Sequence, residues 1–369
     1  MKQGWEYKKL DSCAYIEYGT RVVQKKDGGT IYPVYGGGGE TFRIDRFNRE
    51  DCLIVARFAM SPLCVRYVKG KFFLNDSGLS VKADKELYQS YLNHHIKFLN
   101  DKIYNLGKGA AQRNLDIKSF KNLQIGVPPK STQLAIVSEL DKINELIRLK
   151  KEQLKDYDNL AQSIFYEMFG DPVENEKGWE VKKLGEVSEF KNGLNFNKIE
   201  NGHLIKFLGV SDFQNKRNIS SDTLGHISLL EEVSEDYFLK TDDIVFVRSN
   251  GNKELIGRCV KLTITEPTTY SGFCIRCRIT DEKIDKEFVA CLMKIPTIKQ
   301  LMTNSGRGCN ISNLNQKVLG SIPIICPKIE LQHLFAQRIE QIERQKSSVQ
   351  KSITDLETLL ASRMQYWFE

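Results

Sequence analysis

Two stretches of the chain carry apolar residues at alternating steps of four and three, which is the heptad pattern of a coiled-coil helix. The first stretch begins at Ile136 and the second at Phe335, 199 positions later. We expect the first helix to start at Ser131 and to stop at Gly170 before Asp-Pro, because glycine adopts the left-handed cap and proline cannot continue a helix. It would then run for about 38 residues, or roughly 57 Å. The positions predicted to pack between the helices are Ile136, Leu140, Ile143, Ile147, Leu154 and Tyr157 in the first, and Ile339, Ile342, Val349, Ile353 and Leu356 in the second.

The frame around these helices also occurs twice. Residues 4–10 (GWEYKKL) return as residues 178–184 (GWEVKKL), a shift of 174. An Asn-Leu pair, a proline and a glutamine close each half, and these return with a shift of 199. Similar ends therefore enclose dissimilar inserts, and the second insert is the longer. The closing residues are Asn114, Leu115, Pro128 and Gln133 in the first half, and Asn313, Leu314, Pro327 and Gln332 in the second.

The interior lysines of the two heptad patterns favour pairing of the helices within one chain. Lys150 and Lys346 each correspond to an apolar position, Val349 or Ile147, in the other copy. The alternative is that each helix covers its own domain or forms a homodimer. We predict an α+β fold with a pseudo-twofold internal repeat, in which two mixed α/β domains are separated by two long antiparallel coiled-coil helices. The predicted boundaries are 1–130 and 171–328 for the two domains, and 131–170 and 329–369 for the central and distal helices.

Each insert contains an apolar run that ends in an arginine. Residues 51–57 (DCLIVAR) correspond to residues 242–248 (DDIVFVR) at a shift of 191. Such a run predicts a buried strand that carries Arg57 or Arg248 to the rim of a sheet. Capping of the sheet edge, or pairing with a carboxylate, would explain these arginines equally well.

Polar, glycine-containing loops precede the Asn-Leu pair in both halves, at residues 107–114 and 305–313. Glycine lets a backbone approach phosphate closely, and Arg, Gln and Asn form bidentate hydrogen bonds with guanine and adenine. These loops fit base reading, although each is also compatible with a plain surface turn. The candidate DNA contacts are Lys25, Lys26, Arg43, Arg46, Arg57, Lys108, Gln112 and Arg113 in the first insert, and Arg248, Asn250, Lys253, Arg307 and Asn310 in the second.

The net charge of +7 is concentrated in the first insert. Residues 1–130 contain 22 basic and 13 acidic residues, whereas residues 169–328 contain 22 and 21. A basic insert is compatible with a phosphate-backbone partner, and nearly neutral helices suit protein partners. Many soluble proteins without a nucleic-acid partner are as basic, so charge alone does not decide the function.

Composition places the chain among soluble globular proteins. The 369 residues are 41% hydrophobic, which is enough for more than one core. We expect a cytoplasmic protein, because no apolar run is long enough to span a membrane and the start lacks a secretory signal. The nine scattered cysteines then predict free thiols rather than disulfides.

Several motifs that would indicate catalysis are missing. Residues 36–39 (GGGG) lack the Lys-Ser/Thr of a phosphate-binding loop and predict a flexible turn. Cys274 and Cys277 form a lone C-x-x-C, so zinc is not expected. The sequence shows no methyltransferase motif, and acids such as Asp242 and Asp243 fit a solvated surface better than a nuclease site. We therefore expect no catalytic or metal site and no bound cofactor in this chain.

The order of these features resembles the DNA-specificity subunit of type I restriction-modification systems. The resemblance covers essentially the whole chain and is strongest at residues 169–172 (FGDP) and 178–187 (GWEVKKLGEV). The second copy departs from it at residues 326–328 (CPK), which have one proline where the first copy has two.

The resemblance implies a non-catalytic subunit whose two target-recognition domains each read one half of an asymmetric bipartite DNA site. It also implies two modification subunits that methylate adenine with S-adenosylmethionine, and restriction subunits that use ATP and Mg²⁺. The alternatives are a tandem scaffold that binds only proteins, and an autonomous nuclease or methyltransferase.

Overall fold

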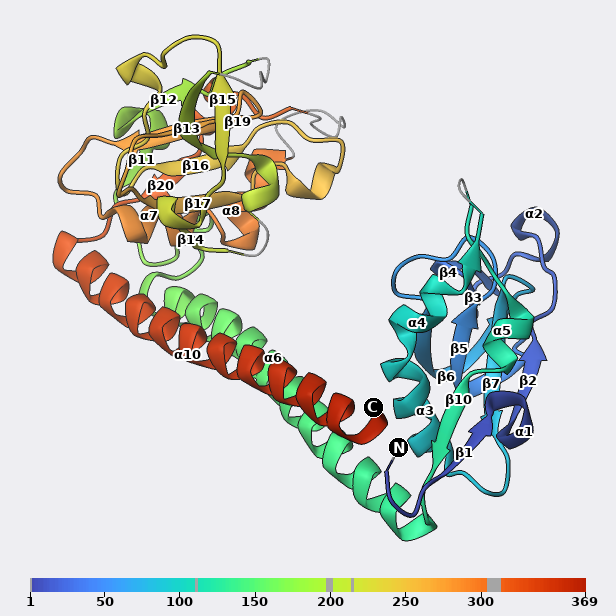
Figure 1. Ribbon diagram of the computed structural model, residues 1–369. Helices are drawn as coiled ribbons and strands as arrows, with labels where there is room; N and C mark the ends of the chain where they lie inside the picture. Colours follow the sequence, from blue (N-terminus) through green and yellow to red (C-terminus); the bar gives the residue numbers. More distant parts are fainter. Residues whose placement is uncertain (1, 110–111, 197–201, 214–215, 304–312) are drawn as a thin grey trace. The chain divides into compact units, whose positions relative to one another are not determined.

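The computed structural model describes residues 2–109, 112–196, 202–213, 216–303 and 313–369. The chain forms two compact units. Unit 1 consists of residues 1–153 and 349–369, and unit 2 consists of residues 154–348. Each unit therefore combines one globular insert with one half of each long helix (Figure 1).

Unit 1 is built on a six-stranded sheet with the strand order β2-β7-β5-β6-β3-β4. The apolar run at the end of the central strand β5 is buried, and the adjacent pairs are antiparallel except for β3 and β6, which are parallel. Apolar residues of α3 and α4 pack on the sheet in one core. The elements of unit 1 are β1 (Glu6–Lys9), α1 (Leu10–Cys13), β2 (Ala14–Tyr18), α2 (Gln24–Asp27), β3 (Tyr32–Gly36), β4 (Gly39–Ile44), β5 (Arg49–Ala56), β6 (Val65–Leu74), β7 (Gly78–Ala83), α3 (Gln89–Phe98), α4 (Asn100–Asn105), β8 (Gly107–Lys108), β9 (Asn114–Leu115), α5 (Ile117–Lys121) and β10 (Gln124–Val127).

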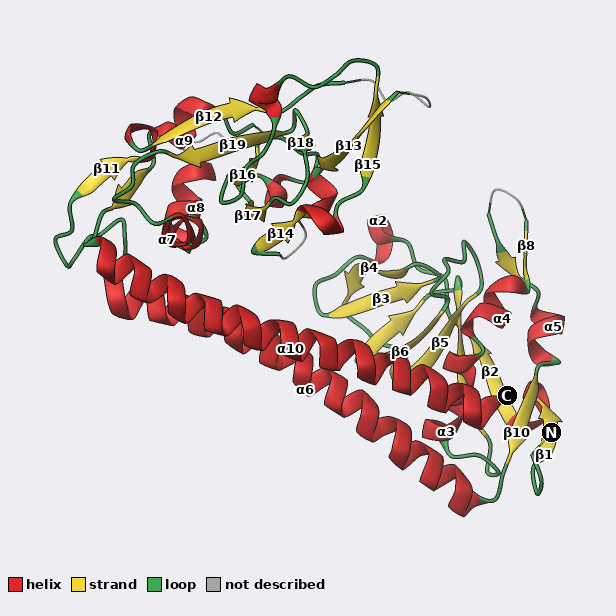
Figure 2. Ribbon diagram, turned by 60° about the vertical axis from the view of Figure 1, so that its left-hand side comes forward, coloured by secondary structure: helices red, strands yellow, loops and turns green. Residues whose placement is uncertain are grey.

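Unit 2 contains a five-stranded sheet, β12-β19-β16-β17-β14, and a three-stranded sheet, β15-β13-β18. The helices α7 and α8 lie between the larger sheet and the long helices (Figures 1 and 2). The elements of unit 2 are β11 (Val181–Lys183), η1 (Leu184–Glu186), β12 (Ser188–Asn192), β13 (His203–Leu208), η2 (Val210–Asp212), β14 (Asn218–Ser220), η3 (Ser221–Thr223), β15 (His226–Leu229), η4 (Glu235–Tyr237), β16 (Ile244–Val247), η5 (Lys253–Leu255), β17 (Cys259–Thr263), β18 (Thr268–Tyr270), β19 (Cys274–Ile279), α7 (Lys286–Leu292), α8 (Pro296–Thr303), α9 (Gln316–Gly320) and β20 (Pro323–Ile325).

The internal repeat extends further into the inserts than the sequence indicates. The order β2-β7-β5-β6-β3 in unit 1 has the same pairing as β12-β19-β16-β17-β14 in unit 2. In both units the last of these strands is parallel to its neighbour and the other pairs are antiparallel. The units differ in β4 of unit 1 and the additional sheet of unit 2. The two inserts are thus variations on one sheet.

The long helices are α6 (Lys130–Phe169) and α10 (Ile329–Phe368). The helix α6 starts one residue before the predicted Ser131. It ends at Gly170, whose φ of +76° is the left-handed cap expected there. Within the described part of the chain, no helix combines the length and hydrophobicity needed to cross a membrane.

In unit 1 the first part of α6 packs against the last part of α10. Ile136 and Leu140 are fully buried in a core that includes Leu360, Met364 and Trp367 of α10. Polar contacts fix the same alignment, because Glu139 pairs with Arg363 and accepts a hydrogen bond from Trp367 Nε1 at 2.9 Å.

In unit 2 the last part of α6 packs against the first part of α10. Phe165 and Phe169 surround Phe335, with ring centroids 5.6 and 5.4 Å from it, and Lys346 pairs with Asp158 at 2.7 Å. Within each unit, later positions of α6 meet earlier positions of α10, so the predicted antiparallel pairing within one chain is confirmed. The predicted packing positions Ile136, Leu140, Ile143, Ile147, Ile339, Ile342, Val349 and Ile353 are buried, whereas Leu154, Tyr157 and Leu356 are half-buried.

Candidate nucleic-acid interface

Arg57 follows the last residue of β5 and is fixed by backbone hydrogen bonds on both sides. Its N–H donates to the carbonyl of Ser77 and its carbonyl accepts from the N–H of Leu115, both at 2.8 Å. Its guanidinium carbon lies 4.9 Å from the ring centroid of Tyr18 and 4.3 Å from that of Phe58. Stacking on two aromatic rings restricts the side chain before any ligand arrives.

Arg248 occupies the equivalent backbone position at the end of β16. Its N–H donates to the carbonyl of Phe273 at 2.9 Å, and its carbonyl accepts from the N–H of Leu314 at 2.7 Å. The correspondence with Arg57 predicted from the repeat is therefore present in three dimensions. The neighbour that accepts from Arg248 is a phenylalanine with 59% of its surface exposed, whereas the neighbour of Arg57 is a serine.

The hairpin of β8 and β9 joins the rim next to Arg57. Its Arg113 carbonyl accepts from the N–H of Met60 at 3.0 Å, and the Arg113 guanidinium carbon lies 4.6 Å from the Tyr104 ring centroid. Lys108 is exposed and pairs with Asp116 at 2.5 Å. The Lys108 ammonium and the N-terminal N–H groups of α5 hold the pKa of the Asp116 carboxyl at about 2. Arg57, Lys108 and Arg113 thus share one rim, and Gln112 lies exposed in the same hairpin.

The glycine turn at residues 36–39 also packs against this rim, so our expectation of a flexible turn is corrected. The N–H of Gly37 donates to Ser77 Oγ at 3.1 Å, and its carbonyl accepts from Arg66 Nη1 at 3.2 Å. A Cβ added at Gly37 would lie 2.1 Å from the carbonyl oxygen of Phe58, so the close approach requires glycine. Arg66 was missed by the sequence analysis, because nothing in its local pattern distinguishes it from other surface cations.

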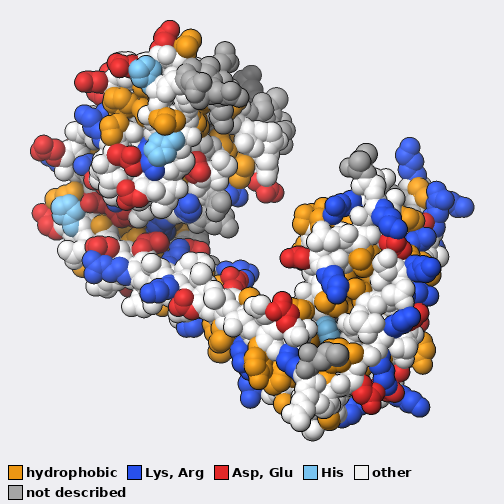
Figure 3. Space-filling model, in the orientation of Figure 1, with side chains coloured by type: hydrophobic (Ala, Val, Ile, Leu, Met, Phe, Trp, Pro, Cys, Tyr) orange, Lys and Arg blue, Asp and Glu red, His pale blue; other side chains and the backbone are white. Residues whose placement is uncertain are grey.

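The remaining candidates of the first insert form a second basic group. Lys25 and Lys26 are exposed on α2, and Arg46 pairs at 3.2 Å with Asp27 of the same helix. Arg43 of the edge strand β4 donates to the carbonyl of residue 31 at 2.8 Å. Figure 3 shows exposed basic side chains over the part of unit 1 that carries α2. These residues are separate in their contacts from the rim of Arg57.

The structure describes fewer candidates of the second insert. Arg307 and Asn310 lie outside the described residues, as does the side chain of Lys253. Asn250 is half-buried, and its side-chain oxygen accepts from the N–H of Asn252 at 2.8 Å. Phe273 is the residue beside Arg248 that the sequence analysis missed, although an exposed aromatic residue after a Ser-Gly turn is a usable signal.

The acidic residues that we left open as a nuclease site are structural. Asp243 is buried and accepts two hydrogen bonds from Arg278, both at 2.7 Å. Asp242 pairs with Lys261 at 3.3 Å. Among the described residues, no group of three or more His, Cys, Asp or Glu side chains is arranged to hold a metal ion.

The two cysteines of the C-x-x-C sequence are both buried in β19. Burial raises the pKa of the Cys274 and Cys277 thiols to about 12. Both thiols are protonated near neutral pH, so neither is a nucleophile or a ready metal ligand.

The fold and the two equivalent arginine positions define a protein built from two copies of one binding module joined through paired helices. A family model described as "Type I restriction modification DNA specificity domain" matches residues 2–156 and 176–358. The chain belongs to this family.

Curated relatives carry the same description at low sequence identity. The chain is 23% identical over 304 residues to the type I restriction enzyme StySPI specificity subunit of Salmonella potsdam, covering 78% of this chain and 65% of that protein. It is 23% identical over 322 residues to the MjaVIII specificity subunit of Methanocaldococcus jannaschii, covering 79% and 75%. It is 21% identical over 293 residues to the EcoKI specificity subunit of Escherichia coli strain K12, covering 74% and 63%. The chain thus spans less than two thirds of the StySPI and EcoKI subunits.

Two solved structures share the fold over the full chain. The S subunit of a type I restriction-modification system from M. genitalium has a TM-score of 0.56 at 18% identity, covering 100% of this chain and 98% of that chain. A chain from a structure on complex assembly and conformational transition of the type I R-M system has a TM-score of 0.58 at 16% identity, with the same coverage. At these identities the likeness concerns the fold alone.

Proposed function

We propose that this chain is the DNA-recognition subunit of a type I restriction-modification complex and that each unit reads one half of a bipartite, asymmetric site. The observation that carries the proposal is the equivalence of Arg57 and Arg248, which the same two backbone hydrogen bonds hold beside different neighbours. A common scaffold with different side chains at its rim gives two readers of different sequences.

Unit 1 carries the larger electrostatic contribution to DNA binding. The basic group around α2 suits phosphate contacts, which add affinity without sequence information. The stacked guanidinium groups of Arg57 and Arg113 suit base edges, because a restricted arginine loses little entropy when it forms a bidentate hydrogen bond.

The paired helices carry the proposed protein contacts. Leu134, Leu146 and Leu149 of α6 in unit 1 are 49%, 47% and 46% exposed, although the inner face of the same helix is buried. Exposed leucines on a helix whose own seam is filled fit a partner's apolar surface. We propose that two modification subunits bind along these helices and that restriction subunits join the same assembly.

The chemistry is assigned to the partners. The modification subunits would use S-adenosylmethionine and the restriction subunits would use ATP and Mg²⁺, while this chain binds no cofactor and catalyses no step. The complex would act in the cytoplasm, where its DNA substrate lies.

Duplex binding by the assembled complex, titrated with salt, tests the proposal. Arg57→Ala and Arg113→Ala should each weaken specific binding by about 1–3 kcal/mol and relax one base position. The double change Lys25→Ala with Lys26→Ala should weaken all sequences alike and reduce the slope of log affinity against log salt by about two. Unchanged binding in all of these variants would contradict the assignment, and a wild-type complex that binds no DNA would favour a protein-only scaffold.

A further inference from the structure

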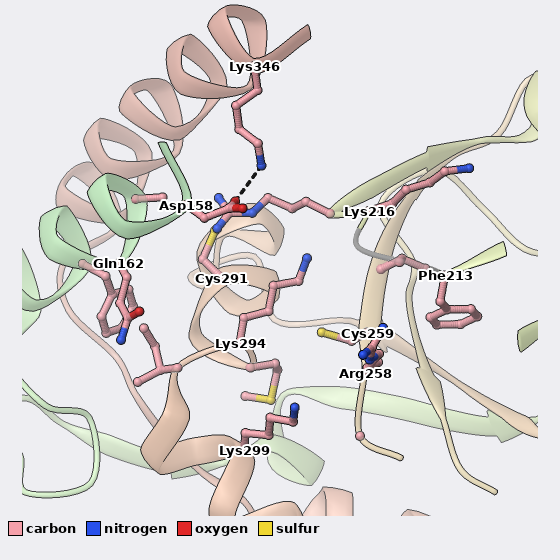
Figure 4. A pocket seen from close by; sticks show the side chains of 17 residues that line it. Asp158, Gln162, Phe213, Lys216, Arg258, Cys259, Cys291, Lys294, Lys299 and Lys346 are labelled. Atoms are coloured by element: carbon pink, nitrogen blue, oxygen red, sulfur yellow. Dashed lines mark hydrogen bonds and ion pairs between the residues drawn. The ribbon is translucent and has the colours of Figure 1, made fainter. Parts of the chain in front are cut away.

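A cavity of about 340 Å³ lies within unit 2, between the globular insert and the halves of α6 and α10 that belong to this unit (Figure 4). Its lining is strongly basic. Among the described lining residues, Asp158 is the one acid, and it is already paired with Lys346 at 2.7 Å. The basic lining residues are Lys216, Arg217, Arg258, Lys294, Lys299 and Lys346.

Arg217 is held in the wall of this cavity with part of its hydrogen-bonding capacity unused. Its side chain is 13% exposed, and Nε lies 3.6 Å from the Glu343 carboxylate. The Nη1 atom is buried and has no hydrogen-bond partner. A buried donor without a partner costs roughly 1–3 kcal/mol, more when it is charged, so a ligand that supplies an acceptor gains that energy.

Lys294 follows α7 and extends into the cavity (Figure 4). Its backbone N–H donates to the carbonyl of Cys291 at 3.0 Å, but its ammonium group makes no hydrogen bond or ion pair with a described residue. Burial lowers the pKa of Lys294, and the charge of Arg217 lowers it further. Two partly desolvated cations therefore share a cavity in which the nearest lining carboxylate is already paired.

We propose that this cavity binds a phosphate group, which would accept hydrogen bonds from Arg217 and Lys294 together. A phosphate offers several charged acceptor oxygens to donors from different directions, as a single carboxylate does not. The volume exceeds that of one phosphate and leaves room for the atoms attached to it. Neither the family nor the proposed DNA contacts assign this site, so the proposal does not rest on the proposed function.

Two sources would present the same chemistry: free phosphate compounds and the DNA backbone. Equilibrium dialysis of the full chain against radiolabelled inorganic phosphate, in chloride at constant ionic strength, measures the first. We expect saturable binding of one phosphate per chain, at least tenfold weaker in Lys294→Met and retained in Lys294→Arg. Lys317→Met, which removes an exposed lysine of the same unit outside the cavity, should bind like the wild type.

The salt dependence of duplex binding by the assembled complex measures the second source. If a backbone phosphate enters the cavity, Lys294→Met should reduce the slope of log affinity against log salt by about one, and Lys317→Met should not. An unchanged slope with saturable dialysis binding supports the site and assigns it to a free phosphate compound.

The proposal is overturned if the wild-type chain shows no saturable phosphate binding and Lys294→Met leaves the slope unchanged. It is also overturned if Lys294→Met matches the wild type in both measurements. If the wild-type complex binds no DNA at all, the proposed function fails, and the dialysis alone decides whether the phosphate site exists.

Discussion

The side chains of Gln133 and Gln332 make the same three hydrogen bonds in their respective units. Each amide oxygen accepts from a backbone N–H at 2.8 Å, that of Tyr88 in unit 1 and that of Asp285 in unit 2. Each amide nitrogen donates to two backbone carbonyls, one of which belongs to the proline five residues earlier, before the long helix. Both side chains are fully buried. One glutamine therefore ties each long helix to its insert.

Replacing Gln133 by alanine should destabilise unit 1, because one N–H and two carbonyls would be buried without their partner. We expect a loss of about 2–4 kcal/mol in the free energy of unfolding, measured by urea denaturation. The exposed Gln337 of α10 offers a control, and its change to alanine should cost less than about 0.5 kcal/mol. Equal effects of the two substitutions would show that the buried hydrogen bonds do not hold the helix.

An acidic residue in the seam should separate the helices. Ile143 is 7% exposed, and Ile143→Glu would bury a carboxylate without a cation to pair with it. We expect strong destabilisation of unit 1 by circular dichroism during thermal unfolding, and loss of modification-subunit capture in pull-down. Ile342→Glu should do the same in unit 2. Normal stability and intact assembly in both variants would contradict the pairing as the basis of assembly.

Changes on the outer face of α6 should affect partners without affecting the fold. Leu146→Glu and Leu149→Glu replace exposed side chains, so the thermal unfolding profile should stay that of the wild type. Capture of the modification subunit should fall at least tenfold, because a carboxylate would face an apolar surface. Lys142→Ala, at an exposed polar position of the same helix, should leave capture unchanged. Undiminished capture by both leucine variants would place the partner surface elsewhere.

The ion pair of Lys108 with Asp116 predicts a pH effect at the rim of unit 1. The pKa of Asp116 in the folded chain is about 2, below its ordinary value of 3.8. The stabilisation is therefore present above pH 3.8 and is lost as the pH falls through about 2. Lys108→Met should raise the Asp116 pKa towards 3.8 in a carboxyl NMR titration. The exposed Lys102 is the control, and an Asp116 pKa that responds equally to Lys102→Met, or not at all to Lys108→Met, would refute the ion pair.

Much of the frame could be predicted from the sequence because it depends on residue types that are repeated. The heptad positions, the cap at Gly170 and the correspondence of Arg57 with Arg248 all follow from spacing. The shared sheet order could not be read in this way, because a buried strand requires apolar residues but not the same ones. In β5 and β16 the apolar character recurs while the residues differ, and in most other strands even that signal is lost.

The close contacts of the site were beyond the sequence for a different reason. The packing of Gly37 on Phe58, the presence of Arg66 at the rim and the convergence of Arg217 with Lys294 join residues that are distant in sequence. No local pattern records such contacts, since they depend on how strands and helices pack.

Methylation mapping of DNA from cells that contain this chain and its partner subunits tests the central claim most directly. The account predicts a bipartite, asymmetric motif in the wild type. Arg57→Ala should relax or abolish recognition in one half of the motif only, and Arg248→Ala in the other half only. A contiguous motif, or a single arginine change that alters both halves, would contradict the assignment of one unit to each half-site.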